Sequence, residues 1–252
     1  FINCSTIEKP QDLTAVLATM RQREVLFLDE LHALPPSARE HLLTAMEDNI
    51  ITVKLPDGGE DSVMTVSLPE FTVIGATTRQ GLLDGPLWTR FQYTLTLRPY
   101  TDAEMYKVVE WHLPDGVTID RHALTEIADN AHGTARVGVN LLAACIDTVA
   151  AAPGSDMTSL TITQADVMAT CRRLGYRGRF TPEEYRYLNA LPDNKCVGLQ
   201  ALAVTLNEHP ATVSEVYEPW LLQQGFIVRR AAGRALSQKG ATMLARLREE
   251  AE

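Results

Sequence analysis

Apolar and polar residues alternate between strand-like and helix-like patterns over the first hundred positions. The run "VLFLDE" at residues 25–30 is apolar until it ends in two acids, and "FTVIGATT" at residues 71–78 is apolar until it ends in small and polar residues. Between them, residues 37–48 place apolar side chains on one helical face, and Ser37 with Glu40 predicts a capping box at the start. Apolar strands separated by helices indicate an α/β fold with a buried parallel sheet.

The segment "IITVKLPDGGEDSVMTVSLP" interrupts this alternation. Apolar and polar residues alternate on both sides of Asp57-Gly58-Gly59, which predicts a β-hairpin over residues 51–67 that projects from the α/β body. The hairpin is either a plain surface feature or a docking arm, and the pattern favours neither strongly.

Helices dominate the remainder of the chain, in two groups. Thr101 and Glu104 predict a capping box on the first helix of the middle group. The stretch "LGYRGRFT" then breaks the helical pattern and predicts a linker. The last group predicts three helices, two short strands around Ala231-Ala232-Gly233 and a closing helix, which is the outline of a winged helix. We therefore expect three domains, at residues 1–98, 99–175 and 176–252.

Composition adds an expected compartment and a charge asymmetry. The chain has 252 residues, 45% of them hydrophobic, which is enough for a packed core. No apolar stretch is long enough to cross a bilayer, so we expect a cytoplasmic protein without membrane contact. Four cysteines lie far apart without a CxxC pair, so their spacing predicts neither a zinc site nor a disulfide framework.

The net charge of −9 is unevenly distributed. Residues 1–171 hold 11 Lys and Arg against 23 Asp and Glu, whereas residues 172–252 hold 12 against 9. This asymmetry predicts that any nucleic acid is contacted by the C-terminal part. The residues expected to meet DNA phosphates on or beside the wing are Arg229, Arg230, Arg234 and Lys239. The alternative is a solvated basic hairpin.

Two acids at the end of a buried strand are the first candidates for chemistry. In a phosphate-loop ATPase of this architecture Asp29 would hold Mg²⁺, usually through water, and Glu30 would polarise the water that attacks the phosphate. The second strand ends at Gly75-Ala76-Thr77-Thr78, where a polar group such as Thr78 would lie beside the γ-phosphate. The alternative is that these threonines merely end a strand and begin a turn.

Two arginines complete the candidate site. Arg90, in "GPLWTRF", follows Thr78 by twelve residues and could reach across a subunit boundary to a neighbour's nucleotide as an arginine finger. Arg136 opens a helix just after "HGTA", where a guanidinium could touch the γ-phosphate and couple domain closure to the nucleotide. Taken singly, each arginine is more often a surface ion-pair partner.

The combination of these motifs in this order resembles the RuvB family, the bacterial AAA+ motors of Holliday-junction branch migration. The segments that carry the resemblance cover nearly the whole chain: "EKPQDLTAVL", "VLFLDELHAL", "AMED", "LPEFTVIGATTR", "GPLWTRF", "HGTARVGVNLL" and "VYEPWLLQQGFIVRRAAGRA". The resemblance implies a partial AAA+ parallel-sheet domain with a β-hairpin insertion, a small helical lid domain and a C-terminal winged helix. It also implies ATP and Mg²⁺ as cofactors and a helicase function in DNA recombination and repair.

By the same resemblance each candidate residue has a role. Asp29 and Glu30 form the Walker B pair, Thr78 is sensor 1, Arg90 is the arginine finger and Arg136 is sensor 2. The hairpin would dock on a RuvA-like partner, and the winged helix would contact double-stranded DNA at Holliday junctions. The active form would be a hexameric ring of identical subunits.

Some features depart from the family pattern. No Gly-Lys dipeptide occurs in these residues, so we expect the phosphate-gripping P-loop to lie upstream and this chain to be inactive alone. Trp88 stands where the family usually has another arginine near the finger. A second hypothesis is a non-hydrolysing DNA-binding or adaptor protein, and a third, a clamp-loader-like subunit, is disfavoured by the winged-helix pattern. The five intact site residues favour the ATP-driven motor.

Overall fold

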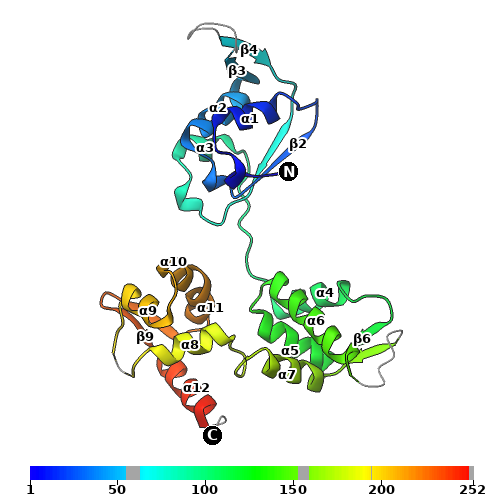
Figure 1. The fold of residues 1–252 in the computed structure, drawn as a ribbon, viewed down its shortest axis with the longest axis vertical. Helices are drawn as coiled ribbons and strands as arrows, with labels where there is room; N and C mark the ends of the chain where they lie inside the picture. The colour runs from blue at the N-terminus through cyan, green and yellow to red at the C-terminus, as the bar shows by residue number, and fades with distance from the viewer. Residues whose placement is uncertain (55–62, 153–158, 194, 250–252) are drawn as a thin grey trace. The chain divides into compact units, whose positions relative to one another are not determined.

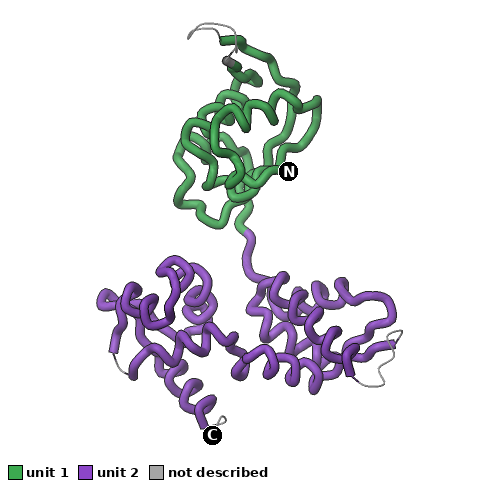
Figure 2. The backbone as a smooth tube through the Cα atoms, in the orientation of Figure 1, with its two compact units in different colours: residues 1–96 green, residues 97–252 purple. Residues whose placement is uncertain are grey.

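The computed structural model describes residues 1–54, 63–152, 159–193 and 195–249. The chain divides into two compact units, residues 1–96 and residues 97–252 (Figure 2). The elements of the first unit are β1 (Ile2–Asn3), η1 (Cys4–Thr6), α1 (Pro10–Leu17), β2 (Val25–Asp29), η2 (Leu31–Ala33), α2 (Pro36–Asp48), β3 (Ile50–Lys54), β4 (Val63–Ser67), β5 (Thr72–Gly75), η3 (Gln80–Leu82) and α3 (Gly85–Arg90) (Figure 1). Within the described ranges, none of the helices combines the length and the apolar character that a bilayer crossing requires.

A parallel sheet forms the centre of the first unit, which confirms the predicted α/β fold. Its strand order is β1-β2-β5, and both pairings are parallel. Leu26 and Leu28 of β2 point into a core that also buries Leu42 and Ala45 of α2. On the opposite face of β2 the side chain of Val25 is exposed. Because successive strand residues point to opposite faces, β2 presents one face to its helices and places Asp29 on the other.

The start of α2 differs from the prediction. No capping box forms, because the helix begins at Pro36 and Pro35 is its N-cap, so Ser37 lies within the first turn. A proline at the first position has no N–H to satisfy and its fixed φ suits a helix, so the Pro-Pro pair sets the start. Arg39 donates instead to the carbonyl oxygens before the helix, at 2.8 Å from that of Leu34.

The predicted hairpin is confirmed in its two strands. β3 and β4 pair antiparallel from Ile50 with Ser67 to Lys54 with Val63, as a sheet separate from the central one. Ile51 and Leu68 are buried in the core of the unit, so the base of the hairpin is anchored there. The predicted turn at Asp57-Gly58-Gly59 lies outside the described residues.

The first part of the second unit is mainly helical. Its elements are α4 (Asp102–Trp111), β6 (Val117–Ile119), α5 (Arg121–Ala131), α6 (Ala135–Ala150), β7 (Leu160–Ile162) and α7 (Gln164–Arg173). The capping box on α4 is confirmed, since Thr101 N–H donates to the Glu104 carboxylate at 2.8 Å and Glu104 N–H to the Thr101 hydroxyl at 3.4 Å. The parallel pair β6–β7 was not predicted, because each strand has only three residues and the two are distant in sequence.

The second part of this unit has the predicted winged-helix outline. Its elements are α8 (Pro182–Ala190), α9 (Leu199–Leu206), α10 (Pro210–Thr212), the π-helical η4 (Val213–Tyr217), α11 (Glu218–Gln223), β8 (Ile227–Arg230), β9 (Gly233–Leu236) and α12 (Gln238–Glu249). The wing is the antiparallel β8–β9 hairpin. Gly233 closes its turn at φ 130°, where an added Cβ would lie 2.3 Å from the Val197 carbonyl oxygen, so only glycine fits.

The two parts of the second unit have separate hydrophobic clusters. One contains Met105, Leu124 and Leu142, and the other contains Phe180 and Leu221. The division near residue 176 into a lid and a winged helix stays a prediction, and we use these two names for residues 99–175 and 176–252 below.

Candidate functional site

The pairing of β2 with β5 brings two distant segments to one edge of the sheet. The register pairs Leu28 with Gly75, and the N–H of Leu31 donates to the Ala76 carbonyl at 2.8 Å. The carboxyl ends of parallel strands therefore meet, which is where open α/β sheets bind ligands. As a result, the acids at 29–30 and the threonines at 77–78 share one edge.

Glu30 combines an uncommon backbone conformation with a partly exposed carboxylate. Its backbone is left-handed, with φ 51° and ψ 48°, which few residues other than glycine adopt. The Thr78 hydroxyl donates to its Oε2 at 3.3 Å, and Nδ1 of His32 lies 3.2 Å from the same oxygen. The Glu30 side chain is 36% exposed, so its carboxylate is open to solvent. Glu30 and Thr78, 48 residues apart, are in contact.

His32 is a site residue that the sequence patterns did not identify. Its Nδ1 lies 3.0 Å from the Thr77 hydroxyl as well as next to Glu30, and its side chain is only 15% exposed. With the proton on Nδ1, the ring donates to the Glu30 carboxylate and limits its orientation. The available signal was the position of His32 two residues after Glu30, on the turn that follows a buried strand.

Asp29 fits a water-mediated magnesium ligand. Its Oδ1 accepts from the N–H of Glu30 at 3.0 Å, and its side chain lies on the face of β2 that the core does not cover. Mg²⁺ keeps several waters and needs only one or two carboxylates, so a single aspartate suffices. No cluster of three His, Cys, Asp or Glu side chains suited to a metal occurs in the described part of the chain, and the role of Asp29 as a magnesium ligand stays a prediction.

The charge of the two acids is felt by a neighbouring thiol. Burial, together with the negative charges of Asp29 and Glu30, raises the pKa of the Cys4 thiol to about 11. Cys4 is fully buried next to Asn3, which pairs with Asp29 in the sheet. The Cys4 thiol therefore lies close enough to the two acids for their negative charge to disfavour its thiolate form.

Arg90 ends α3 and lies in the same unit. Its guanidinium forms an ion pair with Glu47 of α2, and about half of its side chain is exposed. To reach a nucleotide on a neighbouring subunit it would have to leave Glu47. The assignment of Arg90 as the arginine finger stays a prediction.

Arg136 lies in the second unit, in the first turn of α6. Its side chain is exposed, and within the described residues it has no hydrogen-bond or ion-pair partner. A cation at a helix N-terminus is disfavoured by the helix dipole, by about 0.3–1 kcal/mol at an exposed site. This unfavourable placement suits a residue that meets an anion, and its contact with a nucleotide stays a prediction.

The wing arginines have different environments. Glu218 is fully buried and is bound from two sides: Arg229 Nε donates to Oε2 at 2.8 Å and Arg234 Nε donates to Oε1 at 2.8 Å. The Tyr187 hydroxyl donates to Oε1 at 3.1 Å. Burial raises the pKa of Tyr187, and the negative charge of Glu218 raises it further. Two of the four predicted DNA contacts thus also hold the wing onto the helices.

The other two basic residues also differ from each other. Lys239 donates to the Gln224 carbonyl at 2.7 Å, with its ammonium 4.5 Å from the centre of the Phe226 ring. Arg230 is exposed on β8, where its backbone pairs with Gly233, and it is the one of the four whose side chain forms no hydrogen bond or ion pair with the described residues. DNA binding by the set stays a prediction, with Arg230 the least constrained member.

Known families match both ends of the chain. The model of the Holliday junction DNA helicase RuvB P-loop domain matches residues 2–97, and that of the RuvB C-terminal winged helix domain matches residues 178–245. A Holliday junction branch migration complex subunit RuvB from Campylobacter fetus subsp. fetus is 36% identical over 235 residues, 92% of this chain and 67% of the relative. The same subunit from Campylobacter curvus is 36% identical over 236 residues, 92% and 69% of the two chains.

Solved structures agree with these matches. The Thermotoga maritima RuvB Holliday junction branch migration motor superposes with a TM-score of 0.80 at 30% identity, covering 97% of this chain and 77% of that one. The likeness therefore extends over the sheet, the lid and the winged helix.

Proposed function

The chain belongs to the RuvB family of Holliday junction DNA helicases, and on that premise we propose that it is the motor subunit that couples ATP hydrolysis to branch migration of Holliday junctions. The observation that carries the proposal is the contact between Glu30 and Thr78 at the edge of the sheet. A non-hydrolysing adaptor has no physical need for an acid held in a left-handed conformation beside a polar sensor. This favours the motor over the adaptor hypothesis.

Each residue of the site has one task in this proposal. Asp29 would hold Mg²⁺, and the metal would supply charge neutralisation for the phosphates. Glu30 accepts a hydrogen bond from the attacking water and orients it in line with the phosphorus atom. Thr78 and His32 fix the direction of the Glu30 carboxylate. Since both contact the same oxygen, Oε2, they leave Oε1 for the water.

The arginine finger is tested by mixing two inactive variants of the full-length gene product. Arg90→Ala removes the finger and Glu30→Gln removes the base, so each variant alone should lose hydrolysis while retaining ATP binding. If Arg90 acts on a neighbour's nucleotide, mixed rings contain sites with an intact Glu30 from one subunit and an intact Arg90 from the next. Phosphate release should then return. No recovery in a mixture that forms mixed rings would contradict the assignment across subunits.

DNA binding by the wing is tested at Arg230. Arg230→Ala should weaken binding to duplex DNA and lower the salt slope of log K by about one unit, the effect expected for one lost phosphate contact. Fluorescence anisotropy over a range of salt concentrations measures both, and Arg248→Ala serves as the control because Arg248 bonds to Asn189. An unchanged salt slope in Arg230→Ala would mean that Arg230 is a solvated surface residue that contacts no phosphate.

The whole activity is tested on a synthetic four-way junction. The full-length product with ATP, Mg²⁺ and a RuvA-like protein should move the junction, and shortening the hairpin between β3 and β4 should reduce migration only when the partner is present. Hydrolysis by the 252-residue chain should be undetectable, which stays a prediction, as do the hexameric ring and the cytoplasmic location. A full-length product that binds junctions but hydrolyses no ATP would support the adaptor instead.

A further inference from the structure

The most buried contact between the end of α5 and the winged helix is made by a histidine, His132. His132 is the C-cap of α5, with a left-handed backbone at φ 51°. Gly133 follows at φ 71°, where an added Cβ would lie 2.7 Å from Pro99 Cβ, and α6 begins two residues later. The His132 side chain is only 10% exposed. A left-handed residue is a common helix ending, and histidine is among the residues other than glycine that adopt this conformation.

Both nitrogens of the His132 ring have partners in the winged helix. Nε2 lies 2.8 Å from the carbonyl oxygen of Arg179, and Nδ1 lies 3.3 Å from Oε1 of Glu184. A carbonyl oxygen only accepts, so Nε2 carries a proton. Glu184 is buried, and its other oxygen accepts from the N–H of Thr181 at the start of α8. When Nδ1 also carries a proton, the contact with Glu184 is a buried charge-assisted hydrogen bond.

The face of the His132 ring is also occupied. It stacks on the Trp220 ring of α11, with the ring centres 3.5 Å apart and the planes 12° from parallel. Trp220 in turn packs edge-to-face on Phe180, which is fully buried in the winged-helix core. The lid is therefore joined to the centre of the winged helix and not only to its surface.

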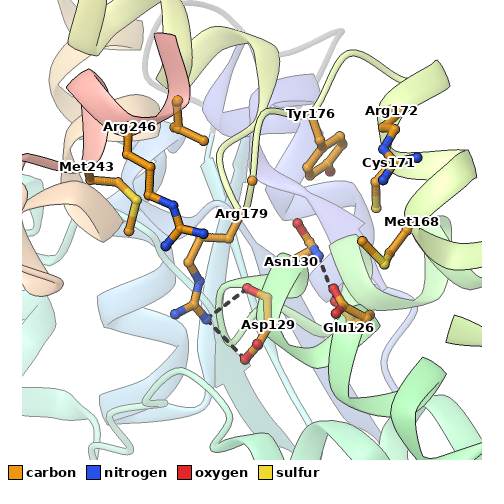
Figure 3. A pocket seen from close by; sticks show the side chains of 12 residues that line it. Glu126, Asp129, Asn130, Met168, Cys171, Arg172, Tyr176, Arg179, Met243 and Arg246 are labelled. Carbon is orange, nitrogen blue, oxygen red and sulfur yellow. Dashed lines mark hydrogen bonds and ion pairs between the residues drawn. The ribbon is translucent and has the colours of Figure 1, made fainter. Parts of the chain in front are cut away.

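A second contact supports the first. Asp129, one turn before His132 on α5, accepts from Arg179 Nη2 at 3.1 Å, and the dashed lines in Figure 3 mark this pair. Arg179 also lies above the Trp220 ring, with its guanidinium carbon 5.9 Å from the ring centre. Both Asp129 and Arg179 are about 40% exposed, so this pair is weaker than the buried His132 contacts.

We propose that His132 is a positioning residue that locks the lid to the winged helix, so that a movement at the start of α6 is passed to the DNA-contacting domain. Arg136, the expected nucleotide sensor, follows His132 by four residues, and this step rests on the proposed function. Displacement of Arg136 moves the turn that contains His132. Because the His132 ring is bound at both nitrogens and stacked on one face, a movement of His132 should displace Trp220 and Glu184 as well.

The lock itself is tested on the 252-residue chain by double electron–electron resonance, which does not depend on motor function. Nitroxides are attached at Glu110→Cys on α4 and Ala201→Cys on α9, both exposed, in a Cys196→Ser background, because the other three cysteines are buried. The distance distribution should be narrow, and His132→Ala should at least double its width. A width equal to that of the unsubstituted chain would overturn the proposal.

Matched variants separate the lock from a folding defect. His132→Phe keeps the stack on Trp220 but removes both ring nitrogens, and should broaden the distribution less than His132→Ala. His132→Arg provides a planar cation that can stack and donate, and should narrow it again. The control His112→Ala changes another helix-ending histidine, whose Nδ1 contacts only the Val108 carbonyl of its own helix, and should have no effect. Broadening in His112→Ala equal to that in His132→Ala would contradict a specific lock.

Transmission is tested in the full-length product with a RuvA-like partner. His132→Ala should retain basal ATP hydrolysis and duplex binding within about twofold but lose at least tenfold in junction migration per ATP hydrolysed, and His132→Arg should recover it. Unchanged migration per ATP in a variant with a broadened distance would overturn the transmission step. An inactive unsubstituted protein would contradict the proposed function instead, and the spin-label distances would still decide the lock.

Discussion

Glu30 and Glu218 are two glutamates whose carboxylates differ in burial and in hydrogen bonding. Glu218 is fully buried, and its two oxygens accept hydrogen bonds from two arginines and a tyrosine. Glu30 is 36% exposed and receives longer contacts, at 3.2 and 3.3 Å, from one histidine and one hydroxyl. One carboxylate is saturated, and the other still has an oxygen available.

The difference shows which surroundings stabilise a buried carboxylate and which leave a carboxylate free to react. Removing a carboxylate from water is unfavourable, so the buried Glu218 carboxylate is stable only because cations surround it. The same hydrogen bonds occupy both of its oxygens, so neither is available for a reaction. Glu30 keeps part of its hydration and is oriented without being neutralised. We therefore expect substitutions at Glu218 to change stability and substitutions at Glu30 to change rate.

The largest effect is expected for Glu30→Gln in the full-length product. An amide cannot act as the base for water, so the rate of ATP hydrolysis should fall by about 10² to 10⁴ while ATP binding is retained. Phosphate release and equilibrium nucleotide binding measure the two quantities. The control Glu40→Gln changes an exposed glutamate on α2 and should leave both within twofold. Normal hydrolysis in Glu30→Gln would remove Glu30 from the catalytic role.

The corresponding change at Glu218 should act on stability. Glu218→Gln leaves Arg234, which is 17% exposed, without its counter-charge, and should lower the free energy of local unfolding of the wing by about 3 kcal/mol. Native-state hydrogen exchange of the β8 and β9 amides measures this. The control Glu183→Gln changes an exposed glutamate on α8 and should cost less than about 1 kcal/mol. A loss below that limit for Glu218→Gln would mean that the wing does not depend on this carboxylate.

A smaller effect on rate is expected at His32. His32→Ala removes one hydrogen bond that orients Glu30, so kcat should fall on the order of tenfold with KM for ATP little changed. The matched control is His41→Ala, because His41 bonds to a different threonine, Thr14, at 2.9 Å, away from the acids. Equal losses in the two variants would indicate a general folding defect and remove His32 from the site.

The smallest expected effect concerns the pKa of a third glutamate, Glu104, whose side chain is exposed. A hydrogen bond from Arg98, then bonds from the Thr101 N–H and hydroxyl, lower its pKa from about 4.5 to about 2. Since the folded pKa is lowered, its stabilising contribution is present above pH 4.5 and is lost as the pH falls toward 2. Carboxyl NMR titration should show the pKa rising in Arg98→Ala. A pKa that stays near 2 would mean that the cap at Thr101, and not Arg98, causes the shift.

Patterns that depend on neighbouring residues were predicted well. The run at residues 25–30 became β2 with its two acids at the strand end, and the Thr101–Glu104 capping box formed as expected. Both depend on local chemistry, on apolar continuity in one case and on a four-residue motif in the other. The capping box at Ser37 failed for an equally local reason, because the preceding prolines started the helix first.

Features that depend on residues distant in sequence were missed. Arg229 and Arg234 pair with a glutamate of another element, so the number of basic residues on the wing does not show that these two are bound and Arg230 is not. His32 contacts the hydroxyl of a threonine 45 residues away, and His132 stacks on a tryptophan of α11. Single-sequence patterns carry no information on such pairs, because the same local sequence fits many partners.

Local patterns in the sequence were enough to predict the acids at the end of β2, the hairpin strands and the winged-helix outline, because hydrophobic periodicity and capping chemistry act over a few residues. Which charged side chains are free and which are bound to partners depends instead on contacts between distant segments of the folded chain. The tertiary structure placed Glu30 beside Thr78, buried Glu218 under the wing and stacked His132 on Trp220. These contacts follow from strand register and helix packing, which are settled only when the whole core forms.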